Sequence, residues 1–518
     1  MADIVLLVGG TGTQAGKTPI CGVCDKTAWD NLDVSDIVGA NGSPIININA
    51  ATDIDYTTTD YPIIDGDFSA LTSVLTKADG GKVYVYLTTV IQDAGSISGL
   101  FEITAAGSGG LTVYKTNLDG QTIIAPTGEN PSQCAVITVG GCLNSIAAAD
   151  TFIVGEFGAT LAHNVDVLDN LSETLGATTM AASSTLLKQI RYIGTVYDNT
   201  TVNNNFAYCG NDKSKFPLKD MTSNSFTNSG NHLDFINIAW TGTNTNQVVA
   251  LANYSNLISC SIVNTSNNNF ASTAVHSVNS DVVNCYIKST GGASKLIANG
   301  ALQLSNSYAS GCYVVAEIAC GIGVSFQSST ASALNNIVIA GASNTAGSGI
   351  IVFGNGTLSR GAQILNNYAY GFGKGINFIT MADIADRGVV VENNIIWGNN
   401  AAGSYGIYNT VYETIDSTAL IGNNFIGNCQ YEDNFAQELD SISLSANPFK
   451  NGSGNMNVAT DFYLNDTAGG GALVKSNWQP LDFDLNGTRD NYQCGTICEQ
   501  PAAGGGGVSQ LINGGFIK

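Results

Sequence analysis

The stretch NNIIWG, residues 393–398, is one copy of a short phrase that recurs along the second half of the chain. Each copy has a small polar residue or cysteine, then residues that favour β-strands, then a glycine or asparagine nearby. Eight copies between residues 235 and 428 read FINIAW, SCSIVN, NCYIKS, GCYVVA, NNIVIAG, NNYAYG, NNIIWG and NNFIGN. Successive copies lie 23 to 31 residues apart, which is the spacing of solenoid repeats.

The repeat length predicts a coil of three short strands, because three such strands with their turns use roughly 20–30 residues. Stacked strands lie about 4.8 Å apart, so one asparagine amide can bond the amide in the next coil. We therefore predict an all-β parallel β-helix with an internal ladder. The predicted ladder residues are Asn237, Cys260, Cys285, Cys312, Asn336, Asn367, Asn394 and Asn424. The cysteines fit either a stack of free thiols or a disulfide between rungs.

The composition argues against several functional classes. The net charge is −22 and charged residues make up only 12% of the chain, which disfavours binding to nucleic acid or to anionic membranes. No apolar run approaches the length of about 18 residues that a membrane helix needs. The three histidines lack the spacing of metal ligands, so we predict neither a metal nor another cofactor.

The first 62 residues do not follow the repeat, and we interpret them as an attachment or oligomerisation region. The start MADIVLLVGG has Asp3 where a signal peptide has basic residues, so no classical signal peptide is expected. The loop GGTGTQAGKT, residues 9–18, ends like a phosphate-binding loop, but Thr11 stands where the first glycine is required. We therefore expect no nucleotide site there.

The remaining chain divides into three further parts. Residues 67–78 have helical apolar spacing behind Asp67, and we expect this short helix to cap the open end of the solenoid. The β-helix is expected over residues 63–465, with its clearest rungs at 235–428. A β cap is expected over 466–500, and a glycine-rich linker with a terminal docking tail over 501–518.

Three stretches resemble the right-handed parallel β-helix proteins of the pectin-lyase-like superfamily. They are VYVYL at 83–87, NLDGQTIIAP at 117–126, and the NNIIWG-type rungs. The resemblance spans about residues 63–500, where PLDFDLNGTRDNYQCGTICE at 480–499 is similar to the closing segment of many such proteins. It implies a right-handed solenoid, in a superfamily that includes polysaccharide lyases and glycoside hydrolases. It does not specify a reaction, because one fold carries many functions.

A hydrolase of this kind needs two carboxylates roughly 5–9 Å apart, which neighbouring coils could supply. The candidate catalytic residues are Asp383, Asp386 and Glu392 on one coil, and Glu413 and Asp416 about one coil later. Solvated loop carboxylates in an acidic protein are the commoner explanation of such a cluster.

We favour a non-enzymatic structural or adhesive virion component: a phage decoration protein, head fibre or tailspike-like appendage. The glycine-linked tail resembles tails of some phage structural proteins. Such a protein would contact capsid or tail proteins, could bind host-surface polysaccharide, would form a homo-oligomer such as a trimer, and would leave the cell by lysis. The alternatives are a polysaccharide lyase, glycoside hydrolase or depolymerase, and a self-assembling extracellular filament or surface protein.

Overall fold

The structure of the chain is a computed structural model, and it describes part of the 518 residues. The described residues are 4–8, 23–25, 46–48, 54–55, 63–64, 69, 72, 75–76, 80–91, 95–108, 110–114, 137–139, 143, 145–157, 164–169, 171–184, 188–194, 216–266, 273–290, 300–317, 321–327, 330–341, 344, 346–353, 361–379, 389–410, 420–434, 440–451 and 459–477.

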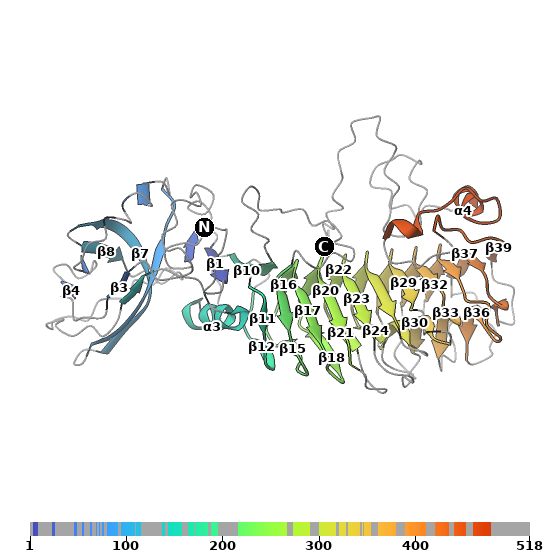
Figure 1. Cartoon of the computed structure of the whole chain (residues 1–518), viewed down its shortest axis with the longest axis horizontal. Helices are drawn as coiled ribbons and strands as arrows, with labels where there is room; N and C mark the ends of the chain where they lie inside the picture. Colours follow the sequence, from blue (N-terminus) through green and yellow to red (C-terminus); the bar gives the residue numbers. More distant parts are fainter. Residues whose placement is uncertain are drawn as a thin grey trace, which may run out of the picture.

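Three columns of parallel strands wind around one apolar core (Figure 1). The first column contains β1 (Ile4–Val8), β10 (Val165–Asp169), β13 (Ile190–Gly194), β16 (Leu233–Ile236), β19 (Asn256–Ile258), β22 (Asp281–Val283), β25 (Tyr308–Ser310), β28 (Ser332–Leu334), β31 (Gln363–Leu365), β34 (Val390–Glu392) and β37 (Leu420–Gly427). The second contains β11 (Glu173–Thr174), β14 (Leu218–Asp220), β17 (Ala239–Gly242), β20 (Ser261–Asn264), β23 (Tyr286–Ser289), β26 (Tyr313–Ala316), β29 (Ile337–Ala340), β32 (Tyr368–Tyr370), β35 (Ile395–Trp397), the end of β37, and β39 (Asp440–Leu444). The third contains β12 (Thr178–Met180), β15 (Phe226–Asn228), β18 (Gln247–Leu251), β21 (Thr273–Val278), β24 (Gly300–Ser305), β27 (Ile322–Phe326), β30 (Ser348–Phe353), β33 (Lys374–Ile379), β36 (Tyr405–Asn409) and β38 (Tyr431–Asp433).

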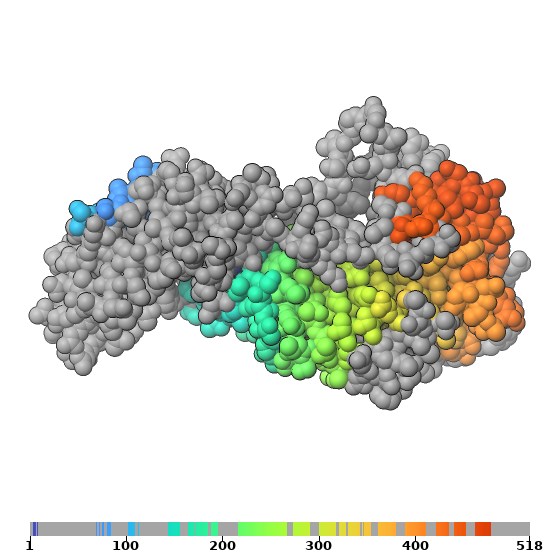
Figure 2. Space-filling model, in the orientation of Figure 1, coloured from blue at the N-terminus to red at the C-terminus, as the bar shows by residue number. Residues whose placement is uncertain are grey.

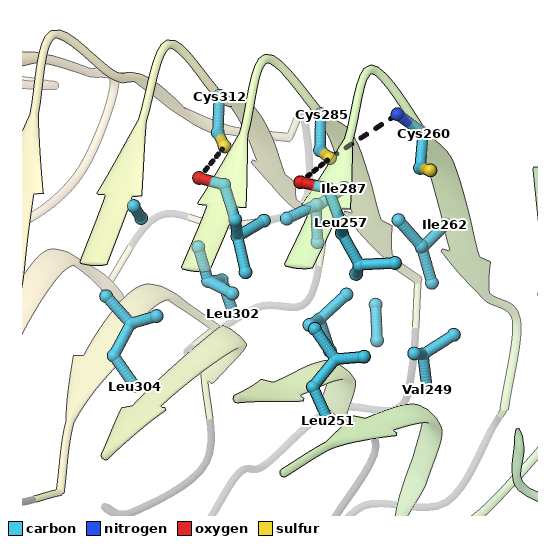
Figure 3. Close-up of a cluster of buried hydrophobic side chains, with 14 of the residues drawn as sticks. Val249, Leu251, Leu257, Cys260, Ile262, Cys285, Ile287, Leu302, Leu304 and Cys312 are labelled. Carbon is cyan, nitrogen blue, oxygen red and sulfur yellow. Dashed lines mark hydrogen bonds between the residues drawn. The ribbon is translucent and has the colours of Figure 1, made fainter. Parts of the chain in front are cut away.

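The pleat of each strand decides which side chains enter the core. In most three-residue strands of the first column the middle residue is fully buried and its neighbours are half-buried, as in β19, where Leu257 points inward. One core cluster extends from Ile4 to Ile426. Figure 3 shows the part of it around Cys260, Cys285 and Cys312. The parallel β-helix predicted from the repeat is therefore confirmed, with three strands per coil.

The asparagine ladder forms at the turn between the first and second columns. Asn336 Nδ2 donates to Asn367 Oδ1 at 3.0 Å, Asn367 Nδ2 donates to Asn394 Oδ1 at 3.1 Å, and Asn394 Nδ2 donates to Asn424 Oδ1 at 2.9 Å. All four side chains are buried. Each amide thereby satisfies polar groups that the turn would otherwise bury without partners.

The cysteine rungs continue this column as free thiols (Figure 3). The thiols of Cys260, Cys285 and Cys312 donate to backbone carbonyls of the preceding coil at 3.2–3.6 Å. Burial raises the pKa of the Cys285 thiol well above its ordinary value. The rungs are therefore occupied by small, weakly polar thiol side chains rather than by a disulfide.

Asn237 does not belong to the ladder. The register pairs Ala239 with Ser261, which places Ile238 beside Cys260. Asn237 instead starts the neighbouring column of turn residues, which hold a left-handed backbone, with φ of 55° at Asn237 and 56° at Asn366. The error was one residue in register, because both columns accept asparagine and only the pairing separates them.

The solenoid starts earlier in the chain than residue 63. Ile4 of β1 pairs in parallel with Val165 of β10, so the first strand already belongs to a coil. The expected strand VYVYL lies instead in β6 (Tyr84–Ile91), which runs antiparallel to β7 (Gly95–Gly107). Alternating apolar residues look the same in both kinds of sheet, but the short link between these strands suits an antiparallel hairpin.

The inserted part of the chain contains antiparallel sheets. One sheet has the strand order β4 (Ile54–Asp55), β5 (Ile63–Ile64), β8 (Gly110–Tyr114), β7, β6. A second pairs β3 (Ile46–Ile48) with β9 (Ile137–Val139), and β2 (Val23–Asp25) pairs antiparallel with β1. In Figure 1 the five-stranded sheet lies beyond the first coil, at the left of the view.

The helix that covers the first coil is α3 (Ile146–Phe157), and not the segment 67–78. Ser145 caps it by accepting a bond from Ala148 N at 2.9 Å. Asp150 accepts bonds from the backbone N–H groups of Ala181 and Ala182 at 2.8 and 3.0 Å, which ties the helix to the coil. The described helical residues of 67–78 lie elsewhere, since Thr72 Oγ1 donates to Ala106 O of β7 at 2.9 Å.

The end of the described chain folds back over the outer face of the second column. We call residues 445–451 and 459–477, which follow β39, the C-terminal strap; it contains η5 (Ala459–Phe462) and α4 (Gly471–Asn477) (Figures 1 and 2). Phe462 packs with Tyr313 and Phe449, with ring centroids 6.1 and 5.1 Å apart. Residues 466–477 are a loop and α4 where a β cap was expected, and residues 478–518 lie outside the described set.

Within the described part of the chain, no helix combines the length and the apolar character that crossing a bilayer would require.

Candidate functional site

One line of polar side chains follows the outer face of the first strand column. Strand register places its members on consecutive coils, and the residue after each member, such as Leu257, points into the core. We call this line the polar row: Asp166, Arg191, Asp234, Asn256, Asp281 and Tyr308.

Hydrogen bonds between coils hold the polar row in place. Arg191 donates through Nε and Nη2 to the two carboxylate oxygens of Asp166, both at 2.7 Å. Asn256 Nδ2 donates to Asp234 Oδ1 at 2.7 Å, and Asn256 Oδ1 accepts the backbone N–H of Asp281 at 3.3 Å. The side chains are therefore oriented before any ligand arrives, which reduces the entropy that binding must overcome.

The carboxyl groups of the row are partly withdrawn from water. Burial raises the pKa of Asp234, against the opposing effects of the Asn256 hydrogen bond and the charges of Arg191 and His232. Burial also raises the pKa of Asp281 and of the half-buried Tyr308. Both carboxyls therefore take up a proton at a higher pH than a solvated aspartate does, and a protonated carboxyl can donate a hydrogen bond.

An aromatic pair borders the row at the turn before β16 and β19. His232 and Tyr254 stack with ring centroids 5.3 Å apart and an interplanar angle of 15°, and Tyr254 is 62% exposed. Both residues have a left-handed backbone, with φ of 54° and 62°. Such a conformation costs a bulky residue about 1 kcal/mol or more, and strain of this kind is often kept at binding sites.

Of the five catalytic candidates predicted from the sequence, only Glu392 is among the described residues. Glu392 ends β34 and is half-buried on the outer face, where its register neighbours are Leu365 and Gly422. The other four candidates, Asp383, Asp386, Glu413 and Asp416, lie outside the described residues. The described set also holds no group of three histidine, cysteine or carboxylate side chains that could bind a metal.

The polar row can be located in the sequence by its fixed offset from the ladder positions. Members of the row stand four residues before the ladder position, as Asn256 stands before Cys260 and Asp281 before Cys285. The same offset leads to Asp234 only when Ile238 takes the ladder position in place of Asn237. The one-residue shift in register therefore conceals only Asp234 from this offset.

The known proteins to which this chain is similar share its fold, and the similarity extends no further than the fold. No family model and no curated protein matches the chain. Among solved structures, it is similar to the A-module of the mannuronan C-5 epimerase AlgE6 of Azotobacter vinelandii, with 13% identity, a TM-score of 0.30, and coverage of 55% of this chain and 85% of that one. It is also similar to the PL6 family alginate lyase AlyGC, with 10% identity, a TM-score of 0.26, and coverage of 61% and 56%. The catalytic domain of a GH87 alpha-1,3-glucanase matches with 12% identity, a TM-score of 0.17, and coverage of 83% and 96%. The assignment of the β-helix rests on the strand pairing of this chain itself.

Proposed function

We propose that the chain is an adhesive, non-enzymatic β-helix protein that binds an extended polysaccharide along the polar row. One observation carries the proposal: fixed polar side chains recur at each coil, about 4.8 Å apart, beside the exposed ring of Tyr254. A sugar chain offers hydroxyl groups to carboxylates and amides, and C–H faces to an aromatic ring. A linear row suits a linear ligand.

The charge of the row favours a neutral polysaccharide. Three of its members are aspartates and its one cation, Arg191, already forms a two-point ion pair with Asp166. The whole chain carries a net charge of −22, which repels anionic sugars at long range. Aspartate and asparagine can both accept and direct bonds from uncharged hydroxyl groups.

Replacing Tyr254 by alanine is expected to weaken glycan binding about tenfold, because it removes an exposed aromatic contact of about 1.4 kcal/mol. Isothermal titration with neutral bacterial polysaccharides would measure this. The matched control is Tyr431→Ala, since Tyr431 is also exposed but lies on β38 of the third column. Equal affinities of wild type and Tyr254→Ala would remove the polar row from consideration as the binding surface.

The wider setting that we propose is a virus particle, with the chain as a trimeric appendage or decoration protein released by lysis. Its support is in the sequence: a glycine-rich segment near residue 505 and an acidic composition. Mass spectrometry of purified particles and sedimentation of the isolated protein test the location and the trimer. A monomer that polymerises would favour the filament alternative.

A glycoside hydrolase is the second candidate, and the spacing of Asp234 and Asp281 favours it. These residues are two coils apart on one face, which places their Cα atoms about 9.5 Å from each other. Their carboxyl groups therefore project from that face at a spacing of the same order as the roughly 6.5–9.5 Å between the two carboxyl groups of inverting enzymes. A raised pKa suits Asp234 to donate a proton. Release of reducing ends by wild type, lost in Asp234→Asn with binding retained, would establish hydrolysis and overturn the non-enzymatic proposal.

A further inference from the structure

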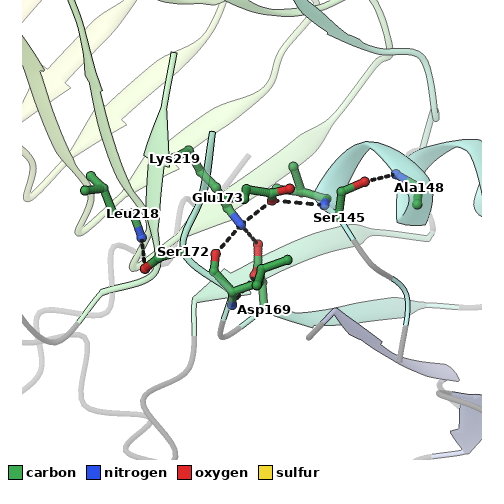
Figure 4. A network of polar contacts seen from close by, with 9 residues as sticks. Ser145, Ala148, Asp169, Ser172, Glu173, Leu218 and Lys219 are labelled. Atoms are coloured by element: carbon green, nitrogen blue, oxygen red, sulfur yellow. Dashed lines mark hydrogen bonds and ion pairs between the residues drawn. The ribbon is translucent and has the colours of Figure 1, made fainter. Parts of the chain in front are cut away.

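A lysine and two carboxylates meet inside the solenoid under helix α3 (Figure 4). Lys219 of β14 occupies an inward-facing position and its side chain is completely buried. Its Nζ lies 2.7 Å from Asp169 Oδ2 and 2.6 Å from Glu173 Oε1. It also donates to Leu171 O at 2.7 Å.

This group is unusual for a structural ion pair. The side chain of Asp169 is as fully buried as that of Lys219, and only 11% of the Glu173 side chain is exposed. Taking such charges out of water costs several kcal/mol per ion, and apolar residues of similar size would often be at least as stable. Neighbouring coils fill the equivalent position with the apolar Trp240 and Ile262.

We propose that Lys219 and Asp169 condense to an intramolecular isopeptide bond, with Glu173 as the proton carrier. The Nζ lone pair attacks Cγ of the protonated Asp169 carboxyl, a C–N bond forms, and the C–Oδ2 bond breaks. The two protons lost from nitrogen and carboxyl leave with that oxygen as one water molecule. No oxidant, reductant or further reactant is needed.

Each neighbouring group has a place in this step. Glu173 Oε1, which also accepts the backbone N–H of Ile146 at 3.2 Å, can take a proton from Nζ and return it to the departing oxygen. Leu171 N donates to Asp169 Oδ1 at 2.9 Å, at the oxygen where negative charge develops during attack. Burial raises the pKa of Asp169, against the attraction of Lys219, and this favours the protonated carboxyl that can lose water.

The fixed positions of Lys219 and Asp169 and the exclusion of water from the core both favour formation of the amide. Groups held in reacting geometry behave as if present at concentrations on the order of 10⁵–10⁸ M, and the amide is shielded from the water that would hydrolyse it. The product is a neutral amide, so the cost of keeping an ion pair in the core disappears. The bond would link β10 to β14 beneath α3, at the end of the solenoid next to the inserted antiparallel sheets.

Mass spectrometry of the reduced, intact full-length protein tests the proposal. We expect the wild-type mass to fall short of the sequence mass by one water molecule. After proteolysis, tandem spectra should show one species that joins the segment containing Asp169 to the segment containing Lys219. A wild-type mass equal to the sequence mass, or loss of water at any other site, overturns the proposal and leaves an ion pair only.

Two variants separate chemistry from folding. Lys219→Met removes the amine and should have the full sequence mass, but it also leaves Asp169 without its counter-ion and could unfold the first coils. Glu173→Gln keeps the shape and the Lys219–Asp169 contact while removing the proton carrier. We expect Glu173→Gln to fold, as circular dichroism would show, and to retain the water. A cross-linked Glu173→Gln protein would contradict the proton-carrier role.

Discussion

Replacing Asn367 by leucine is expected to lower the free energy of unfolding of the solenoid by about 3–5 kcal/mol. Asn367 is buried, donates through Nδ2 to Ala333 O and to Asn394 Oδ1, and accepts the backbone and side-chain N–H groups of Asn336. Leucine removes all four bonds: the backbone N–H of Asn336 loses its acceptor, while Asn394 Oδ1 keeps only the bond from the backbone N–H of residue 367. Each buried group that loses its partner costs about 1–3 kcal/mol. The lost bonds join Asn367 to the coils on both sides, so one substitution affects three successive coils.

Denaturant unfolding followed by circular dichroism would measure this loss. The matched control is Asn366→Gly, one residue earlier, where φ is 56° and glycine adopts that conformation without strain. We expect the control to change stability by less than about 1 kcal/mol. Similar losses for both variants would show that the turn backbone, and not the amide ladder, is the sensitive feature.

Replacing Phe462 by alanine is expected to detach the C-terminal strap while the coils stay folded. Phe462 is fully buried and its ring contacts those of Tyr370 and Phe449, with centroids 5.8 and 5.1 Å apart. Removing such a side chain costs about 3–5 kcal/mol. The strap has few other anchors of this size, whereas the coils retain their own continuous core.

Hydrogen exchange and limited proteolysis over residues 445–477 would detect the detachment. Tyr463→Ala is the control, because the neighbouring Tyr463 is only half-buried and its ring lies 5.5 Å from the Lys450 ammonium, so its loss should cost less than about 1 kcal/mol. If Phe462→Ala lowers the stability of the whole solenoid as much as that of the strap, the two parts unfold as one unit and the expectation fails.

The repeat made the coil predictable because its information is local. Each NNIIWG-like phrase joins a strand to a turn within a few residues, and a spacing of 23–31 residues leaves room for three strands. The buried amide chain from Asn336 to Asn424 follows from that spacing, since residues one coil apart must stack. The repeat did not determine the strand register to the residue. The predicted register was shifted by one position, so it placed Asn237 beside Cys260, where the structure has Ile238.

The sequence by itself determined the class of fold, the number of strands per coil and the ladder from Cys260 to Asn424. Only the tertiary structure decided that β1 pairs with β10 across an inserted antiparallel sheet, that α3 covers the first coil, and that the strap covers the second column. It also decided that Lys219, Asp169 and Glu173 meet. The physical reason is that alternation and helical spacing specify which face of a segment is apolar, whereas the partner of that face depends on contacts between residues far apart in the chain.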